Sequence, residues 1–134
     1  AGCQHVEGLF AYGNLSAQSG YDAMQVILKR GLPFTALFAG NDTLAFGAMQ
    51  ALREAGLSIP QDVAVVGYDD IPLAAFSNPP LTTVRSDPVG HGVQAMQLLV
   101  EQLQADESKR PPPKHYSDPV ELIVRESCGA KLKA

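Results

Sequence analysis

The chain has 134 residues, of which 46% are hydrophobic and 18% are charged, and this composition is typical of a folded domain rather than a disordered segment. The formal net charge is −4 and the basic residues are scattered, which argues against direct nucleic-acid binding by the chain itself. Neither a membrane-spanning apolar run nor a signal-peptide pattern is found. We therefore expect a cytoplasmic protein in which both cysteines, Cys3 and Cys128, are reduced.

Short apolar runs alternate with amphipathic stretches along the chain, which predicts alternating strands and helices. The predicted strands cover residues 6–12, 36–39, 63–68, 81–85 and 121–125. The predicted helices cover residues 16–30, 43–55 and 88–104, with one helical turn over 72–76. Because the run 63–68 is apolar throughout, it is typical of a strand covered on both faces. We therefore predict an α/β fold with a parallel sheet flanked by helices.

The predicted helix 88–104 is the clearest amphipathic helix of the sequence. Asp87 and Pro88 are typical of a helix start, and an apolar stripe follows at helical spacing. Residues 109–114 (KRPPPK) contain three consecutive prolines, so we predict an extended connector there.

Polar residues follow the predicted strands in the loops around Asn14, Asn41 and Asp69–Asp70. In parallel α/β sheets such loops meet at the carboxyl edge of the sheet, where ligands bind. An amide and a carboxylate suit the hydroxyl groups of a polyol, sugar or nucleoside, so Asn41 and Asp69 are candidate ligand residues. The alternative is that Asn14, Asn41 and Asp42 serve turns and helix caps, and that the acids lie in a solvated loop.

No catalytic, metal or cofactor site is predicted. The sequence has no nucleophile elbow, phosphate-binding loop or dinucleotide motif, and His5, His91 and His115 lack metal-ligand spacing. If the strand continues, Asp69 and Asp70 point to opposite sides and do not share a proton.

The predicted helix 43–55 is apolar nearly all round. A helix on the outer face of a sheet needs only one apolar stripe, so its second side must be covered. A partner subunit and another segment of the same chain are the two alternatives.

Several motifs occur together in a fixed order over almost the whole chain. They are residues 19–21 (SGY), 39–42 (AGND), 53–57 (REAGL), 59–63 (IPQDV), 65–70 (VVGYDD), 79–84 (PPLTTV) and 122–127 (LIVRES). In this order the chain resembles the carboxyl-terminal part of bacterial transcription regulators of the lactose-repressor (LacI/GalR) family.

The resemblance implies part of a core of two subdomains, similar to type I periplasmic binding proteins, that holds an effector between them. It implies that residues 1–87 and 119–128 form the second subdomain, that 88–105 is a helix crossing to the first subdomain, and that 106–118 is a Pro-rich connector. It also implies a DNA-binding headpiece and a first subdomain, neither of which this sequence contains.

Carried over residue by residue, the resemblance assigns Leu15, Asn41 and Asp69 to the effector site. Leu15 stands where sugar- and purine-sensing members often have an aromatic residue, which argues against a stacked ring. The effector-clamping arginine of the family would lie before Ala1, so the chain is expected to hold half a site. The residues implied at a homodimer interface are Leu44, Ala45, Ala48, Met49, Leu52, Leu73 and Phe76.

The resemblance therefore predicts the effector-sensing and dimerising part of a transcriptional repressor. A small-molecule effector, a sugar or related polyol, would control its affinity for operator DNA, which binds through the headpiece. One alternative is the solute-binding protein of an ABC sugar transporter, which shares the fold. An α/β enzyme is disfavoured because the catalytic motifs are missing.

Overall fold

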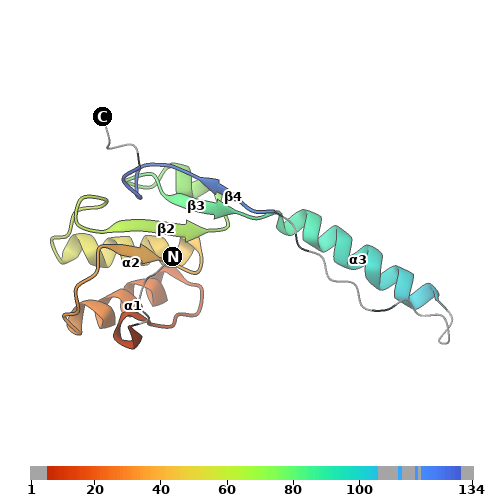
Figure 1. Cartoon of the computed structure of the whole chain (residues 1–134), viewed down its shortest axis with the longest axis horizontal. Coiled ribbons are helices and arrows are strands. Elements are labelled where there is room, and N and C mark those ends of the chain that lie inside the picture. Colours follow the sequence, from red (N-terminus) through yellow and green to blue (C-terminus); the bar gives the residue numbers. More distant parts are fainter. Residues whose placement is uncertain (1–5, 106–111, 113–116, 118, 131–134) are drawn as a thin grey trace. The chain divides into compact units, whose positions relative to one another are not determined.

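The computed structural model describes residues 6–105, 112, 117 and 119–130, and from residue 17 on the chain alternates helices and strands in the predicted order (Figure 1). Its elements are the helices α1 (Ala17–Lys29), α2 (Asp42–Glu54) and α3 (Pro88–Gln104), the 3-10 helices η1 (Glu7–Leu9) and η2 (Pro72–Ala75), and the strands β1 (Ala36–Phe38), β2 (Ala64–Tyr68), β3 (Thr82–Arg85) and β4 (Glu121–Ile123). His5, His115 and Cys3 lie outside the described residues, as does most of the predicted connector.

The strands form one sheet in the order β1-β2-β3-β4. β1 pairs with β2 and β2 with β3 in parallel, with Leu37 opposite Val65 and Gly67 opposite Thr83. β4 runs opposite to β3 (Figure 1). The predicted α/β fold is confirmed, with one antiparallel strand added to the parallel ones.

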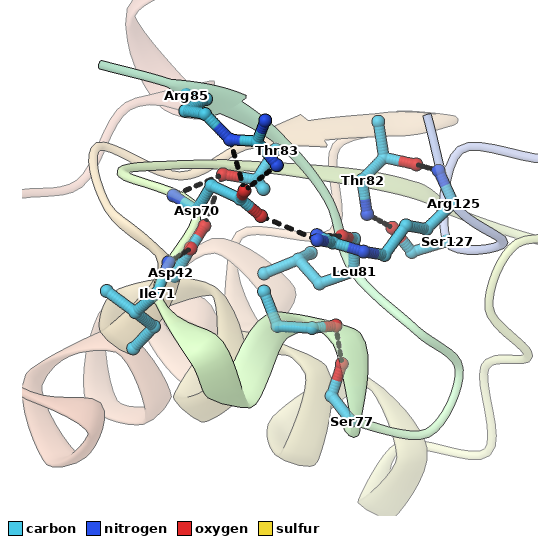
Figure 2. Close-up of polar contacts among 11 residues, drawn as sticks. Asp42, Asp70, Ile71, Ser77, Leu81, Thr82, Thr83, Arg85, Arg125 and Ser127 are labelled. Atoms are coloured by element: carbon cyan, nitrogen blue, oxygen red, sulfur yellow. Dashed lines mark hydrogen bonds and ion pairs between the residues drawn. The ribbon is translucent and has the colours of Figure 1, made fainter. Parts of the chain in front are cut away.

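The segment after β4 is inserted between the starts of two strands. The Ser127 hydroxyl donates to the Val65 carbonyl oxygen at 2.6 Å. It accepts from the Thr82 amide at 2.8 Å (Figure 2). The Val65 amide donates to the Ser127 carbonyl oxygen at 2.8 Å. Because Ser127 is fully buried, these hydrogen bonds join the end of the described chain firmly to β2 and β3.

The predicted strand over residues 6–12 is wrong. Residues 7–9 form the 3-10 helix η1, in which the Leu9 amide bonds to the Val6 carbonyl oxygen. The Arg30 guanidinium donates to the carbonyl oxygens of Gly8 and Phe10, at 2.9 and 2.8 Å. The turn and this side chain thus take backbone groups that a strand would pair with a neighbour.

The chain divides into two units, one comprising Ala1–Arg85 with Leu122–Ala134 and the other Ser86–Glu121. The core of the first unit consists mainly of side chains from α1, α2 and β2, among them Met24, Met49, Leu52 and Val65. In the second unit, no residue of α3 is buried. The subdomain boundaries implied by the resemblance remain a prediction.

Candidate functional site

The predicted ligand residues lie at the carboxyl ends of two neighbouring parallel strands. Asn41 follows β1 and Asp69 follows β2, and the Ala39 amide donates to the Val66 carbonyl oxygen where the strands end. Leu15 joins them from the loop before α1, since its carbonyl oxygen lies 3.4 Å from the Asn41 Nδ2 donor. The structure therefore brings Leu15 directly to Asn41 and places Asp69 on the next strand of the same edge.

Asn41 also caps a helix. Its Oδ1 accepts a hydrogen bond from the Leu44 amide at 2.8 Å and so caps α2. The cap interpretation is confirmed. One N–H of the Nδ2 group reaches the Leu15 carbonyl oxygen, which leaves the other N–H as a donor that a ligand could use. Asn14 likewise serves a turn, because its Oδ1 accepts from the Ser16 hydroxyl at 2.6 Å.

The backbone at Asp69 and Asp70 is unusual. β2 ends at Tyr68, and the next two residues have φ angles of 104° and 56°, in the region that non-glycine residues rarely adopt. Such strain persists only when surrounding contacts hold the backbone in place. The Asp69 amide donates to the Val84 carbonyl oxygen at 2.8 Å, and its side chain is exposed at the strand end.

Asp70 carries an ion-pair cluster that the sequence did not reveal. Its side chain is only 7% exposed, and its Oδ2 accepts from Arg85 Nε and Nη2 while its Oδ1 accepts from Arg125 Nη2 (Figure 2). All of these N–O distances are 2.6 to 2.7 Å. Burial opposes ionisation, but the hydrogen bonds from Arg125 and Arg85 outweigh it and hold the pKa of Asp70 below its ordinary value. Asp69 and Asp70 therefore make different contacts: Asp70 binds two arginines, whereas Asp69 is exposed.

Asp42 is a second buried acid beside this cluster. It is fully buried at the start of α2 and accepts from the Thr83 hydroxyl at 2.6 Å and the Ile71 amide at 2.9 Å (Figure 2). Burial raises the pKa of Asp42, although the Thr83 and Ile71 hydrogen bonds oppose this. The bond from the Ile71 amide agrees with the interpretation that Asp42 serves the backbone. Asp42 braces the loop that follows β2.

A large hollow of the surface does not coincide with these residues. A surface cavity of about 970 Å³ lies between the segment around Phe10 and α1, and none of Leu15, Asn41 and Asp69 lines it. The chemistry of the strand-end loops is a better guide to the ligand site, because ligand sites in parallel sheets form at that edge.

Among the described residues, no helix combines the length and apolar character needed to cross a membrane.

The residues implied at a homodimer interface fall into two groups. Ala45, Ala48, Met49 and Leu52 are at most 5% exposed, because the core of the same chain covers them. For these four the same-chain alternative holds, so they offer no surface to a partner. Leu44 is half-buried, whereas Leu73 and Phe76 are 55% and 83% exposed.

Parallel strands with polar loops at their carboxyl ends define the class of α/β ligand-binding domains. Residues 1–128 match the model of the periplasmic binding protein-like domain, and the chain belongs to that family.

Transcriptional regulators are prominent among the similar proteins. The ribose operon repressor of Escherichia coli (strain K12) is 42% identical over 103 residues, which make up 77% of this chain and 31% of the repressor. A solved CelR–cellobiose complex has a TM-score of 0.85 and 35% identity, over 94% of this chain and 38% of that one. A lac repressor dimer bound to operator and an anti-inducer has a TM-score of 0.74 and 35% identity, over 86% and 39%. The resemblance to the lactose-repressor family is confirmed.

The chain spans about a third of the length of the curated relatives it matches.

Proposed function

We propose that the chain is the ligand-sensing part of a cytoplasmic transcriptional repressor whose operator affinity is controlled by a small sugar-like effector. The observation that carries the proposal is the pair Asn41 and Asp69 at the carboxyl ends of adjacent parallel strands. The Asn41 Nδ2 group can donate to a hydroxyl or ring oxygen, and the exposed Asp69 carboxylate can accept from one or two hydroxyl groups.

The other acids near this edge are already engaged. Asp42 bonds to Thr83 and Ile71, and Asp70 bonds to two arginines. Asp69 is thus the carboxylate presented to a ligand, and Leu15, which is 63% exposed and lies next to Asn41, supplies an apolar contact. A flat aromatic surface is missing at Leu15, so recognition rests on hydroxyl hydrogen bonds rather than on ring stacking.

The effector acts by favouring one arrangement of the complete protein over another. A ligand shifts such an equilibrium only by its difference in affinity for the two states. The operator and the effector then affect each other's binding by the same factor. The repressors named above support this proposal, and nothing in their names supports an enzyme or a transport protein.

The test is the double substitution Asn41→Ala with Asp69→Ala in the complete regulator. We expect D-ribose or cellobiose to lower operator affinity of the unmodified protein, and the double variant to lose that response at least tenfold while it still binds operator. Fluorescence anisotropy with labelled operator measures both. Asp62→Asn, an exposed acid before β2, is the control. Normal release by the double variant would contradict the site assignment.

The same proposal includes a homodimer. Leu73 and Phe76 are the most exposed of the implied interface residues and lie in and just after η2. Large exposed apolar side chains that adjoin each other are typical of interaction sites. We expect Phe76→Asp to weaken self-association of the complete regulator at least tenfold in sedimentation, and unchanged association would remove Phe76 from the interface.

A further inference from the structure

We propose that Asp70 is a positioning residue, which ties the ligand residue Asp69 to the two strand ends where the chain leaves and re-enters the first unit. The inference rests on the proposed function, in which Asp69 binds the effector. Arg85 is the last residue of the first unit before the chain enters the second, and Arg125 follows shortly after its return at Leu122. Both arginines bind the carboxylate of Asp70.

The geometry at Asp70 distributes one carboxylate between the two strand ends. Arg85 occupies Oδ2 through Nε and Nη2, both at 2.7 Å, and Arg125 occupies Oδ1 at 2.6 Å (Figure 2). An ionised carboxylate has two acceptor oxygens and can serve two guanidinium groups at once. An asparagine has one acceptor oxygen and a donating amide, so it can satisfy only one of the two arginines.

Arg125 is held independently on β3. Its Nη1 donates to the Leu81 carbonyl oxygen at 2.8 Å, and its backbone amide donates to the Thr82 hydroxyl at 2.9 Å. The Arg125 side chain is 17% exposed, and such a shielded, hydrogen-bonded arginine has a defined position rather than a solvated one. A displacement of Asp70 therefore affects the segment around Arg125 as well as β3.

Asp69 cannot move without Asp70. Both residues have positive φ angles, and the backbone on either side is bonded, through the Asp69 amide to Val84 and through the Ile71 amide to Asp42. The Asp70 amide also reaches the Thr83 hydroxyl at 3.4 Å. A ligand that pulls on the Asp69 carboxylate thus acts on a backbone whose next side chain holds Arg85 and Arg125.

The first experiment needs no ligand and uses the 134-residue chain. We expect Asp70→Asn to speed hydrogen exchange of the Asp69 and Arg125 amides together at least tenfold, while α1 and α2 stay as in the unmodified chain. Asp62→Asn removes a carboxylate from the other end of β2 and is the matched control. Exchange at these amides equal to that of the control would overturn the inference.

A milder variant guards against general unfolding. Arg85→Gln removes one of the two guanidinium groups that bind Asp70. The Arg85 side chain is 51% exposed, so its loss disturbs the core little. We expect the same pair of amides to respond, by a smaller factor, with the helices unchanged. If only the Asp69 amide responds in both variants, Asp70 does not connect the two strand ends and the inference is wrong.

The second experiment separates binding from transmission in the complete regulator, with D-ribose as the probe. We expect Asp70→Asn to reduce the change in operator affinity at saturating ribose at least tenfold. Asp69→Asn should instead weaken ribose binding and keep that change once ribose saturates. A full response by Asp70→Asn at saturation would overturn the inference. If the unmodified protein does not respond to ribose, the proposed function fails for ribose, and hydrogen exchange alone decides for or against Asp70.

Discussion

The helices α2 and α3 begin in the same way but differ in what covers them. Each follows a capping side chain, Asn41 or Asp87, that accepts a hydrogen bond from the third residue along. α2 buries most of its apolar side chains in the core of the first unit, whereas every residue of α3 keeps substantial exposure within the described structure. Caps and apolar spacing thus specify a helix, but they do not say whether its cover lies in the same chain.

Glycine substitutions in the two helices test this difference in cover most directly. A Cβ on Gly47 in α2 would lie far inside contact distance of the Ala17 carbonyl oxygen and 2.6 Å from the Tyr21 amide of α1. Because backbone atoms cannot move aside, we expect Gly47→Ala to lower the free energy of unfolding by about 3 kcal/mol or more. Urea denaturation of the 134-residue chain, followed by circular dichroism, measures it.

The matched change in α3 is Gly92→Ala, because a Cβ there would have no atom within 4 Å. Alanine is favoured over glycine inside a helix by about 1 kcal/mol, so this variant should gain helix content or leave it unchanged. An equal decrease in the free energy of unfolding for Gly47→Ala and Gly92→Ala would mean that α3 is covered as closely as α2.

A second pair of substitutions tests the same difference at apolar side chains. Leu52 in α2 is fully buried and Leu103 in α3 is 73% exposed. We expect Leu52→Ala to cost about 3 kcal/mol and Leu103→Ala less than about 1 kcal/mol in the 134-residue chain. Urea denaturation provides both values.

In the complete regulator, the cost of Leu103→Ala should rise if further chain covers α3, while that of Leu52→Ala stays the same. A Leu103→Ala cost near that of Leu52→Ala in the 134-residue chain alone would show that α3 already has its cover.

The sequence predicted these elements well, because apolar periodicity and helix caps are local signals. The strand over 6–12 failed because Arg30, far along the chain, takes carbonyl oxygens of that segment. The position of Asn41 and Asp69 could be predicted from strand ends, since parallel strands present them at one edge. The Asp70 cluster could not be predicted, because Arg125 reaches Asp70 across 55 positions of sequence and no spacing rule connects them.

The burial of α2 shows the same limit. An apolar helix surface looks alike in sequence whether a partner or the same chain covers it, and only the packing of α1 and the strands showed that Ala45 and Met49 are internal. Exposure at Leu73 and Phe76 followed from the short turn of η2, which the sequence predicted without its orientation.

The last difference concerns the buried acids of the first unit, and it predicts how stability depends on pH. The folded-state pKa of Asp70 is lowered, so its stabilising contribution is present above the ordinary value of 3.8 and is lost as the pH falls through the folded-state value. The folded-state pKa of Asp42 is raised by burial, so its ionised form costs stability, and that cost disappears as the pH falls. The two acids therefore act in opposite directions.

Single substitutions separate the two contributions. Between about pH 6 and about pH 3, we expect the free energy of unfolding of Asp70→Asn to fall less steeply than that of the unmodified chain, because the acid-sensitive contribution is gone. Asp42→Asn should fall more steeply, because the compensating protonation is gone. Urea denaturation across this range, on the 134-residue chain, gives both slopes. Identical slopes for the two variants would mean that neither arginine cluster nor burial controls the acids, and that the loop after β2 is solvated in solution.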